Sequence, residues 1–269
     1  MLLHLTTAIC IFIFYIITRL IDDYMKKQYS ITLLNKKLTT NTFIICDYKC
    51  KCFHINNLTL FKCNFCKLNN VINFENINSV MQMLRIINIK EKIDLIIHTE
   101  GGSSCYSDAI SSLFCINNLN IHTYIPEYAQ SAGTIIALTG KQIHCNWYSF
   151  FSPVDSQLEF YTDNDYDQDL TFSSKHIKYI KTIKDSSNID KLQALEAESH
   201  YKEDKYIMNI ILKNNTNKKE IIRKFVDTDF PHGFNITYND MKKMNLPVDL
   251  DISDNIKFSF KLFKFILNL

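Results

Sequence analysis

The sequence predicts an α/β domain built around a parallel sheet, and three observations carry that prediction. Short apolar runs alternate with segments of helical periodicity from residue 93 onward. The first run, residues 93–98 (IDLIIH), is almost wholly apolar, which is typical of a strand buried on both faces. Four of the five glycines fall within residues 101–140, where the turns between these elements are expected. Parallel strands need crossover connections, and the alternating pattern supplies helices for them.

Each expected element follows from its own pattern. The expected elements are, in order, a helix at 76–88, a strand at 93–98, a helix at 106–116, a strand at 121–126, a helix at 131–139 and a strand at 141–145. Residues 159–172 are acidic, aromatic and poorly patterned, so we expect a mobile loop there. A long helix is expected over 174–214, with a possible break near Asn188, before a smaller helix-and-turn unit over 218–269.

The chain divides into four predicted segments. They are an anchor at 1–20, a β-rich and cysteine-bearing lead-in at 21–70, a catalytic domain at 71–250 and a C-terminal tail at 251–269. The hydrophobic content of 46% is ample for a sizeable core. The formal net charge is only +2, so the composition argues against nucleic acid or an acidic polymer as a partner.

The N-terminal segment is predicted to be a single transmembrane helix. Residues 2–18 are apolar except for His4, and this length lies at the lower edge of what crosses a bilayer. A cleaved signal peptide fits less well, since no basic region precedes the apolar run and no small-x-small cleavage site follows it. A buried core helix is the remaining alternative. The basic residues that follow place the rest of the chain in the cytoplasm by the positive-inside rule; they are Arg19, Lys26, Lys27, Lys36 and Lys37.

Nine cysteines at irregular spacing argue against a disulfide scaffold and favour a reducing compartment. A possible zinc site combines one histidine, His54, with four of these cysteines: Cys50, Cys52, Cys63 and Cys66. The Cys-x-Cys half is tighter than structural zinc sites prefer, so we favour reduced cysteines. The sequence therefore predicts no metal and no cofactor.

Two segments that follow successive predicted strands carry the candidate chemistry. Gly101 and Gly102 leave backbone N–H groups available to a polarised carbonyl, although a tight connection is the simpler interpretation. Ser131 begins a predicted helix, where it is either a nucleophile or an ordinary N-cap. Because ligands bind at the carboxyl edge of parallel strands, the two segments are expected side by side. We predict that Ser131 attacks and that the N–H groups of Gly102 and Ala132, with Gly101, form the oxyanion pocket.

Three ordered stretches also resemble a known family. IDLIIHTEGG, YIPEYAQSAGTIIAL and FFSPVDSQL are similar to the serine dehydrogenase proteinases, which belong to the Clp-type peptidase and crotonase-like superfamily. FPHGFNITYNDMKKMNLPV looks like the family's C-terminal motif, so the resemblance covers residues 70–250. Glu100 and Ser156 stand where the family usually has proline. The resemblance implies a Clp/crotonase-like spiral of ββα units that assembles into homo-oligomers.

The general base is the missing part of this site. Clp-type peptidases place a histidine at an interval that here ends in residues 152–157, and these contain none. A Ser-His-Asp triad is therefore not carried over. His144 is expected to pack at the surface, and His232 could reach the site only through folding that the sequence does not reveal.

A lysine is the alternative base, since membrane-bound peptidases of the superfamily use a Ser-Lys dyad. Lys175 follows the expected loop at the start of a helix, which is the context that the resemblance requires. The opposing interpretation is a solvated basic stripe that continues through Lys178, Lys181 and Lys184. Asp155 is expected to orient the base or bind substrate, unless it only caps a turn.

The function predicted from the sequence is that of a membrane-anchored serine endopeptidase that cleaves peptides or membrane-associated proteins. A catalytically inactive scaffold or binding protein is the first alternative, because no clear base is present. A crotonase-type acyl-CoA enzyme is the second, and it is disfavoured because such sites use carboxylates around a thioester and have no need of Ser131.

Overall fold

The structure is a computed structural model of the chain. It describes residues 19, 42–46, 54–55, 58–59, 72, 80–81, 91–160, 170–177, 188–228 and 230–268. These belong to two compact units, which are considered separately. The first comprises Met1–Thr40, Tyr48–Cys66 and Ser253–Leu269, and the second comprises Asn41–Asp47 and Lys67–Ile252. Every residue of the predicted catalytic site lies in the second unit.

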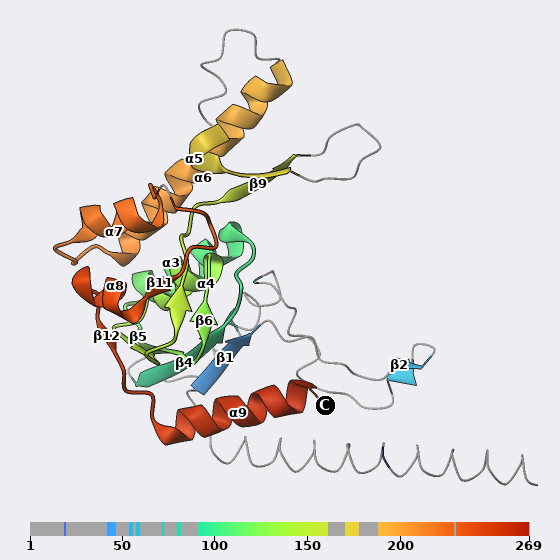
Figure 1. Cartoon of the computed structure of the whole chain (residues 1–269), viewed down its shortest axis with the longest axis vertical. Helices are drawn as coiled ribbons and strands as arrows, with labels where there is room; N and C mark the ends of the chain where they lie inside the picture. The colour runs from blue at the N-terminus through green and yellow to red at the C-terminus, as the bar shows by residue number, and fades with distance from the viewer. Residues whose placement is uncertain are drawn as a thin grey trace, which may run out of the picture. The chain divides into compact units, whose positions relative to one another are not determined.

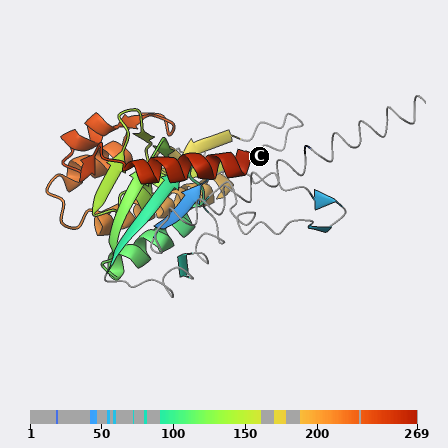
Figure 2. The ribbon, with the colours of Figure 1, turned by 90° about the horizontal axis from the view of Figure 1, so that it is seen from below.

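A five-stranded parallel sheet forms the centre of the second unit, as Figures 1 and 2 show. The strands follow the order β1-β4-β5-β7-β12, and every neighbouring pair is parallel. Their bounds are β1 (Thr42–Cys46), β4 (Lys92–His98), β5 (Asn120–Ile125), β7 (Gln142–Cys145) and β12 (Val248–Asp249). The three central strands confirm the strands predicted near residues 93, 121 and 141. β1 comes from the segment predicted as a separate lead-in, yet it pairs with β4 along five residues.

Two helices connect the central strands, as predicted. α3 (Ser104–Ile116) joins β4 to β5, and α4 (Ala132–Ala137) lies between β5 and β7. α3 buries Ile110 and Phe114, and every residue of α4 is buried. The apolar side chains of these helices and of the strands form one hydrophobic core. Burial of this interior fixes the loops at the strand ends, where the candidate site lies.

A second, smaller sheet brings a late part of the chain to the site. It contains β11 (Ile236–Thr237), β8 (Phe150–Phe151) and β6 (Tyr128–Ala129), in that order. β6 and β8 are parallel, and β8 and β11 are antiparallel. The segment just before Ile236 is therefore held close to the segment that leads into Ser131.

Part of the expected mobile loop at 159–172 is regular structure, which corrects that prediction. β9 (Gln157–Phe160) and β10 (Leu170–Ser173) pair antiparallel, while residues 161–169 lie outside the described residues. Hydrogen bonds between β9 and β10 satisfy the backbone groups of both strands. The two strands therefore form without the alternation of apolar residues by which a strand is recognised in a sequence. The predicted long helix begins as α5 (Ser174–Ile177) and continues as α6 (Asn188–Ile211), which starts at the residue where a break was expected.

The last part of the chain is a series of helices and short strands. α7 (Lys218–Phe225) and α8 (Tyr238–Lys243) lie in the second unit. α9 (Asp254–Asn268) lies in the first unit. The first unit also contains two short strands from earlier in the chain, β2 (His54–Ile55) and β3 (Leu58–Thr59). A capping box between Thr237 and Asp240 starts α8. Within the described residues, no helix combines the length and the apolar character that crossing a bilayer requires.

Some predictions concern residues that the structure leaves undescribed. The predicted anchor, residues 2–18, lies outside the described residues. So do the four cysteines of the possible zinc site; they are Cys50, Cys52, Cys63 and Cys66. Of the helix predicted at 76–88, only Val80 and Met81 are described, and both are helical.

Candidate active site

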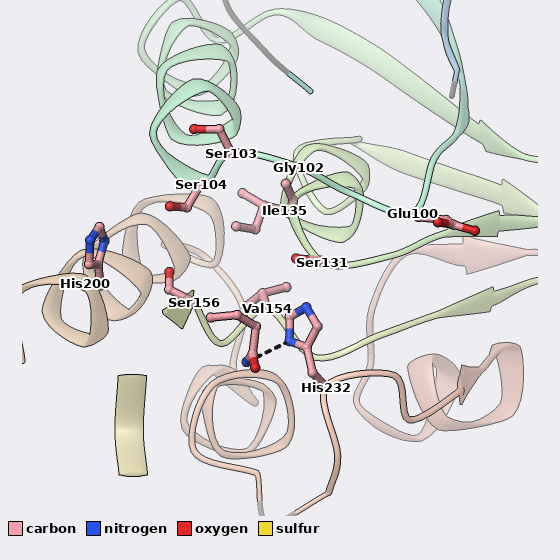
Figure 3. A pocket seen from close by; sticks show the side chains of 12 residues that line it. Glu100, Gly102, Ser103, Ser104, Ser131, Ile135, Val154, Ser156, His200 and His232 are labelled. Atoms are coloured by element: carbon pink, nitrogen blue, oxygen red, sulfur yellow. Dashed lines mark hydrogen bonds between the residues drawn. The ribbon is translucent and has the colours of Figure 1, made fainter. Parts of the chain in front are cut away.

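Both predicted segments open into one cavity of about 430 Å³ in the second unit. Its described lining combines backbone and side chains from the ends of β4 and β6 with residues from α6 and from the loop before β11. The lining residues are Glu100, Gly102, Ser103, Ser104, Ser131, Ala132, Ile135, Val154, Ser156, Gln157, His200 and His232 (Figure 3). Gly102, Ser131 and Ala132 thus meet as the sequence predicted.

Ser131 has a strained backbone. Its φ of 50° and ψ of −120° lie in a region that L-residues rarely adopt. It occupies the N-cap position of α4, yet its side chain makes no capping hydrogen bond. The ordinary structural role of a serine at a helix start is therefore not the role of Ser131. Strain of this kind costs on the order of 1–3 kcal/mol and is concentrated at functional sites.

A network of hydroxyl groups holds this turn in place. The N–H of Ser131 donates to Ser152 Oγ at 2.7 Å, and Ser152 Oγ donates to the carbonyl of Pro153 at 3.1 Å. The N–H of Ser152 donates to Thr134 Oγ1 at 3.2 Å, and that hydroxyl donates to the carbonyl of Ala129 at 2.6 Å. Ser152 and Thr134 are fully buried, so these bonds are shielded from water. The network fixes the backbone from which the Ser131 side chain projects.

The paired glycines lie directly against Ser131. A Cβ on Gly101 would stand 2.8 Å from the Cβ of Ser131 and 3.0 Å from the carbonyl oxygen of Gln130. Gly101 and Gly102 both have positive φ, 121° and 143°. Only glycine fits this close approach and this backbone conformation.

The two glycines differ in their backbone donors. The N–H of Gly101 donates to Thr99 Oγ1 at 3.0 Å, so it is already occupied. Ile72 donates to the carbonyl of Gly101 and accepts from the N–H of Ser103, so the N–H of Gly102 points away from Ile72. Gly102 is exposed and lines the cavity. The N–H of Gly101 is therefore not available to a ligand, and Gly101 has a steric role beside Ser131 in place of the donor role predicted for it.

The structure brings a histidine and an aspartate to the same cavity. His232 Nδ1 lies 2.9 Å from Asp155 Oδ1, and Asp155 is almost fully buried. Gln157 Nε2 donates to Asp155 Oδ2 at 3.1 Å and to the Asp155 carbonyl at 3.0 Å, which fixes the carboxylate. The ring of His232 points toward Ser131 (Figure 3). With Nδ1–H donated to Asp155, Nε2 is the ring nitrogen left to accept a proton.

His232 is the residue that sequence reasoning missed. The interval of 101 residues between Ser131 and His232 hides the pair, because only the pairing of β11 with β8 brings the loop before Ile236 back to the site. One indication was available, since His232 is the histidine inside the FPHGF stretch that carries part of the family resemblance.

Lys175, the predicted base, is not among the described residues that line the cavity. It lies in α5 and is 6% exposed, and its Nζ has no hydrogen-bond partner within the described part of the chain. The neighbouring Ser174 donates its N–H to the carbonyl of Ser156 at 2.8 Å, so α5 is attached close to the site. His144, expected at the surface, is partly buried and lies 2.8 Å from Asp249.

The chain is similar in sequence to a family of known proteins and to two relatives. The sequence pattern of the ClpP-like SDH-type serine proteinase family matches residues 5–267. The uncharacterized protein MJ0137 of Methanocaldococcus jannaschii is 24% identical over 199 residues, which cover 72% of this chain and 66% of that protein. The uncharacterized protein MJ1495 of the same organism is 24% identical over 183 residues, which cover 67% and 60%. The chain thus spans less than two thirds of the length of either relative.

Solved structures with similar architecture include two proteases. A variant of the 1510-N membrane-bound stomatin-specific protease aligns with a TM-score of 0.47 and 15% identity, over 72% of this chain and 79% of that chain. ClpP1 from Listeria monocytogenes aligns with a TM-score of 0.48 and 14% identity, over 84% and 97%.

Proposed function

The chain belongs to the ClpP-like SDH-type serine proteinase family and has an α/β ClpP/crotonase-like fold, and on that premise we propose that it cleaves peptide bonds by acyl transfer through Ser131. The observation that carries the proposal is the lining of one cavity by Ser131 and by His232, which is bonded to the buried Asp155. We assign the role of base to His232 and not to Lys175, because His232 lines the cavity.

The proposed reaction begins when His232 Nε2 takes the proton of Ser131 Oγ as that oxygen attacks the carbonyl carbon of the peptide bond. The N–H groups of Gly102 and Ala132 stabilise the negative charge that develops on the carbonyl oxygen. His232 then gives its proton to the leaving amine, and Asp155 stabilises the imidazolium between these two steps. A water molecule, activated by the same histidine, hydrolyses the acyl-enzyme and restores Ser131.

Substitution of the nucleophile tests the proposal. Ser131→Ala should abolish peptide hydrolysis and covalent labelling by a fluorophosphonate, because no other described group in the cavity occupies the same position. Ser103→Ala is a matched control, since Ser103 lines the same cavity at the start of α3 and should keep full labelling. Circular dichroism and thermal unfolding would verify that both variants are folded. Unchanged hydrolysis in Ser131→Ala would refute the role of Ser131, and a wild-type chain inert to every phosphonate would favour the inactive scaffold.

We further propose that residues 2–18 anchor the protein in a membrane and that the domain assembles as a homo-oligomer with its site in the cytoplasm. The apolar composition of the segment and the basic residues after it support the anchor. Its substrates would then be peptides or membrane-associated proteins. Carbonate extraction of cell membranes tests the anchor, because an integral protein stays in the pellet. Sedimentation of the detergent-solubilised chain tests the assembly.

A further inference from the structure

The cavity extends from Ser131 to a polar end formed by two helices. Ser103 and Ser104 come from the start of α3, and His200 comes from α6. Figure 3 shows Ser104, Ser156 and His200 gathered on one side of the cavity, apart from Ser131 and His232. Hydroxyl and imidazole groups at this end can accept hydrogen bonds from a polar side chain.

Among the described residues that line the cavity, the formal charge is negative. Glu100 lines the cavity and is exposed, on the side away from His200 (Figure 3), and no lysine or arginine occurs among the described lining residues. Asp155 lies beside the cavity in the pair with His232. His200 is the only described side chain at the polar end that could become a cation, and its Nδ1 lies 3.4 Å from Glu203 Oε2. The potential of such a cavity attracts positive groups and repels negative ones.

A half-buried carboxyl group, Asp108, and a fully buried one, Asp204, lie one helical turn beyond the polar end. Asp108 follows Ser104 by four residues on α3, and Asp204 follows His200 by four residues on α6, so each lies on the same face as a lining residue. Burial, reinforced by Asp204 and Glu203, raises the pKa of Asp108 to about 7. Burial raises the pKa of Asp204 to about 6, against the effect of its hydrogen bonds from Ser156. A cation placed nearby would stabilise the ionised form of both groups.

Ser156, which replaces the proline usual in the resembling family, contributes to this arrangement. Its N–H donates to Asp204 Oδ2 at 2.9 Å, and its hydroxyl donates to Asp204 Oδ1 at 2.7 Å. The proline usual at this position in the resembling family offers neither donor. Asp204 is fully buried, so without these two bonds its carboxylate would lose its described hydrogen-bond donors. Ser156 therefore holds a negative charge directly behind the cavity wall.

The position of the base indicates which part of a substrate would occupy the polar end. His232 must give its proton to the leaving amine, so the leaving segment lies on the His232 side of Ser131. Ser104 and His200 lie apart from His232 in Figure 3, so the residue that supplies the attacked carbonyl carbon would extend toward them. We propose that this end of the cavity receives a lysine or arginine side chain of the residue whose carbonyl carbon Ser131 attacks. This inference rests on the proposed peptidase function and adds its substrate class.

Matched phosphonates test the inference. Aminoalkyl diphenyl phosphonates that carry a lysine-like or a norleucine side chain differ in charge at nearly equal length. We expect the lysine-like reagent to label Ser131 at least about tenfold faster. Asp108→Asn should reduce this ratio severalfold, whereas Glu196→Gln, which removes an exposed charge from α6, should leave it unchanged. Ser104→Lys should reverse the preference in favour of a glutamate-like reagent.

The outcomes separate the inference from the function on which it rests. Equal labelling by the lysine-like and norleucine reagents, both lost in Ser131→Ala, would overturn the cationic preference and leave the nucleophile intact. The cationic preference would also be overturned if Asp108→Asn and Glu196→Gln changed the ratio of the two labelling rates equally, since general surface charge would then be the cause. Absence of labelling by every phosphonate would reject both the inference and the proposed function.

Discussion

Two histidine–aspartate pairs occur among the described residues of the second unit, and their geometry is nearly the same. His232 Nδ1 lies 2.9 Å from Asp155 Oδ1, and His144 Nδ1 lies 2.8 Å from Asp249 Oδ1. The environment of the carboxylates differs. Each carboxylate also accepts from a glutamine, Gln157 or Gln142, but the side chain of Asp155 is 2% exposed, whereas that of Asp249 is 36% exposed.

The second ring nitrogen separates the two pairs further. His144 Nε2 lies 3.1 Å from His122 Nδ1, and the His144 ring stacks on Tyr124 with centroids 4.5 Å apart. The His232 ring points into a cavity toward a serine with a strained backbone. A histidine–aspartate bond is thus not itself a catalytic feature. What the remaining nitrogen faces decides between proton transfer and cross-strand stabilisation.

The largest expected difference comes from removing each histidine. His232→Ala should lower kcat by at least about 10⁴-fold, because Ser131 loses its proton acceptor. His144→Ala should keep kcat within about threefold and lower the free energy of unfolding by about 1–3 kcal/mol, since Asp249 and His122 lose their partner. Peptide hydrolysis and urea unfolding of both variants measure the two effects. Comparable kcat losses in the two variants would contradict the distinction between the pairs.

Gly101→Ala should produce a smaller loss at the same cavity. Its φ of 121° is unfavourable for alanine, and the added Cβ would meet Ser131 Cβ at 2.8 Å. We expect a loss of about 1–3 kcal/mol in stability and of about 10²-fold in kcat, because the nucleophile must move. Gly140→Ala is the control, since its Cβ would meet Thr123 Oγ1 at 2.6 Å, apart from the cavity lining. That variant should lose stability and retain the kcat of its folded fraction.

The predictions made around these glycines show which features of the fold a local sequence pattern can establish. Apolar runs and glycine placement predicted β4, β5, β7 and the meeting of Gly102 with Ser131, because buried strands and tight turns restrict the residues they accept. The pairing of β12 with β7 was not predictable, since two residues carry no detectable periodicity.

The position of the proposed base, His232, was not predictable for a similar reason. Its position depends on the pairing of β11 with β8, a contact between segments more than 80 residues apart that no local pattern records. The helix start predicted at Lys175 is confirmed as α5, but it follows the strand β10 where a mobile loop was predicted. A helix start, however, does not determine what its side chains face.

Lys175→Met sharpens the choice between the two candidate bases. If His232 is the base, the variant should keep kcat within about threefold, whereas loss of a catalytic lysine would cost about 10³-fold or more. Its free energy of unfolding should equal or exceed that of the wild type, because Nζ is buried without a hydrogen-bond partner within the described residues. Steady-state kinetics with a single peptide substrate decides the point. A kcat loss equal to that of His232→Ala would restore Lys175 as the base.

The smallest expected effect concerns pH and the non-catalytic pair. Burial, followed by the charges of Lys92 and His144, lowers the pKa of His122 below its usual 6.5, against the opposing effect of Asp94 and Asp249. Below pH 6.5 the unfolded chain therefore takes up this proton before the folded chain does. The contribution of His122 to the free energy of unfolding is therefore fully present above pH 6.5 and decreases as the pH falls toward the pKa of His122 in the folded state. Because solvent screens this partly exposed ring, we expect a change of less than about 1 kcal/mol.

Urea unfolding between pH 5 and pH 8 would measure this effect. His122→Asn should remove the corresponding part of the acid destabilisation, whereas His176→Asn, which changes an exposed histidine of α5, should not. Identical pH profiles for the wild type and His122→Asn would show that the His122–His144–Asp249 chain does not store this proton-linked stability. Any loss of stability at low pH would then come from other titratable groups, and the comparison between the two histidine–aspartate pairs would rest on kinetics alone.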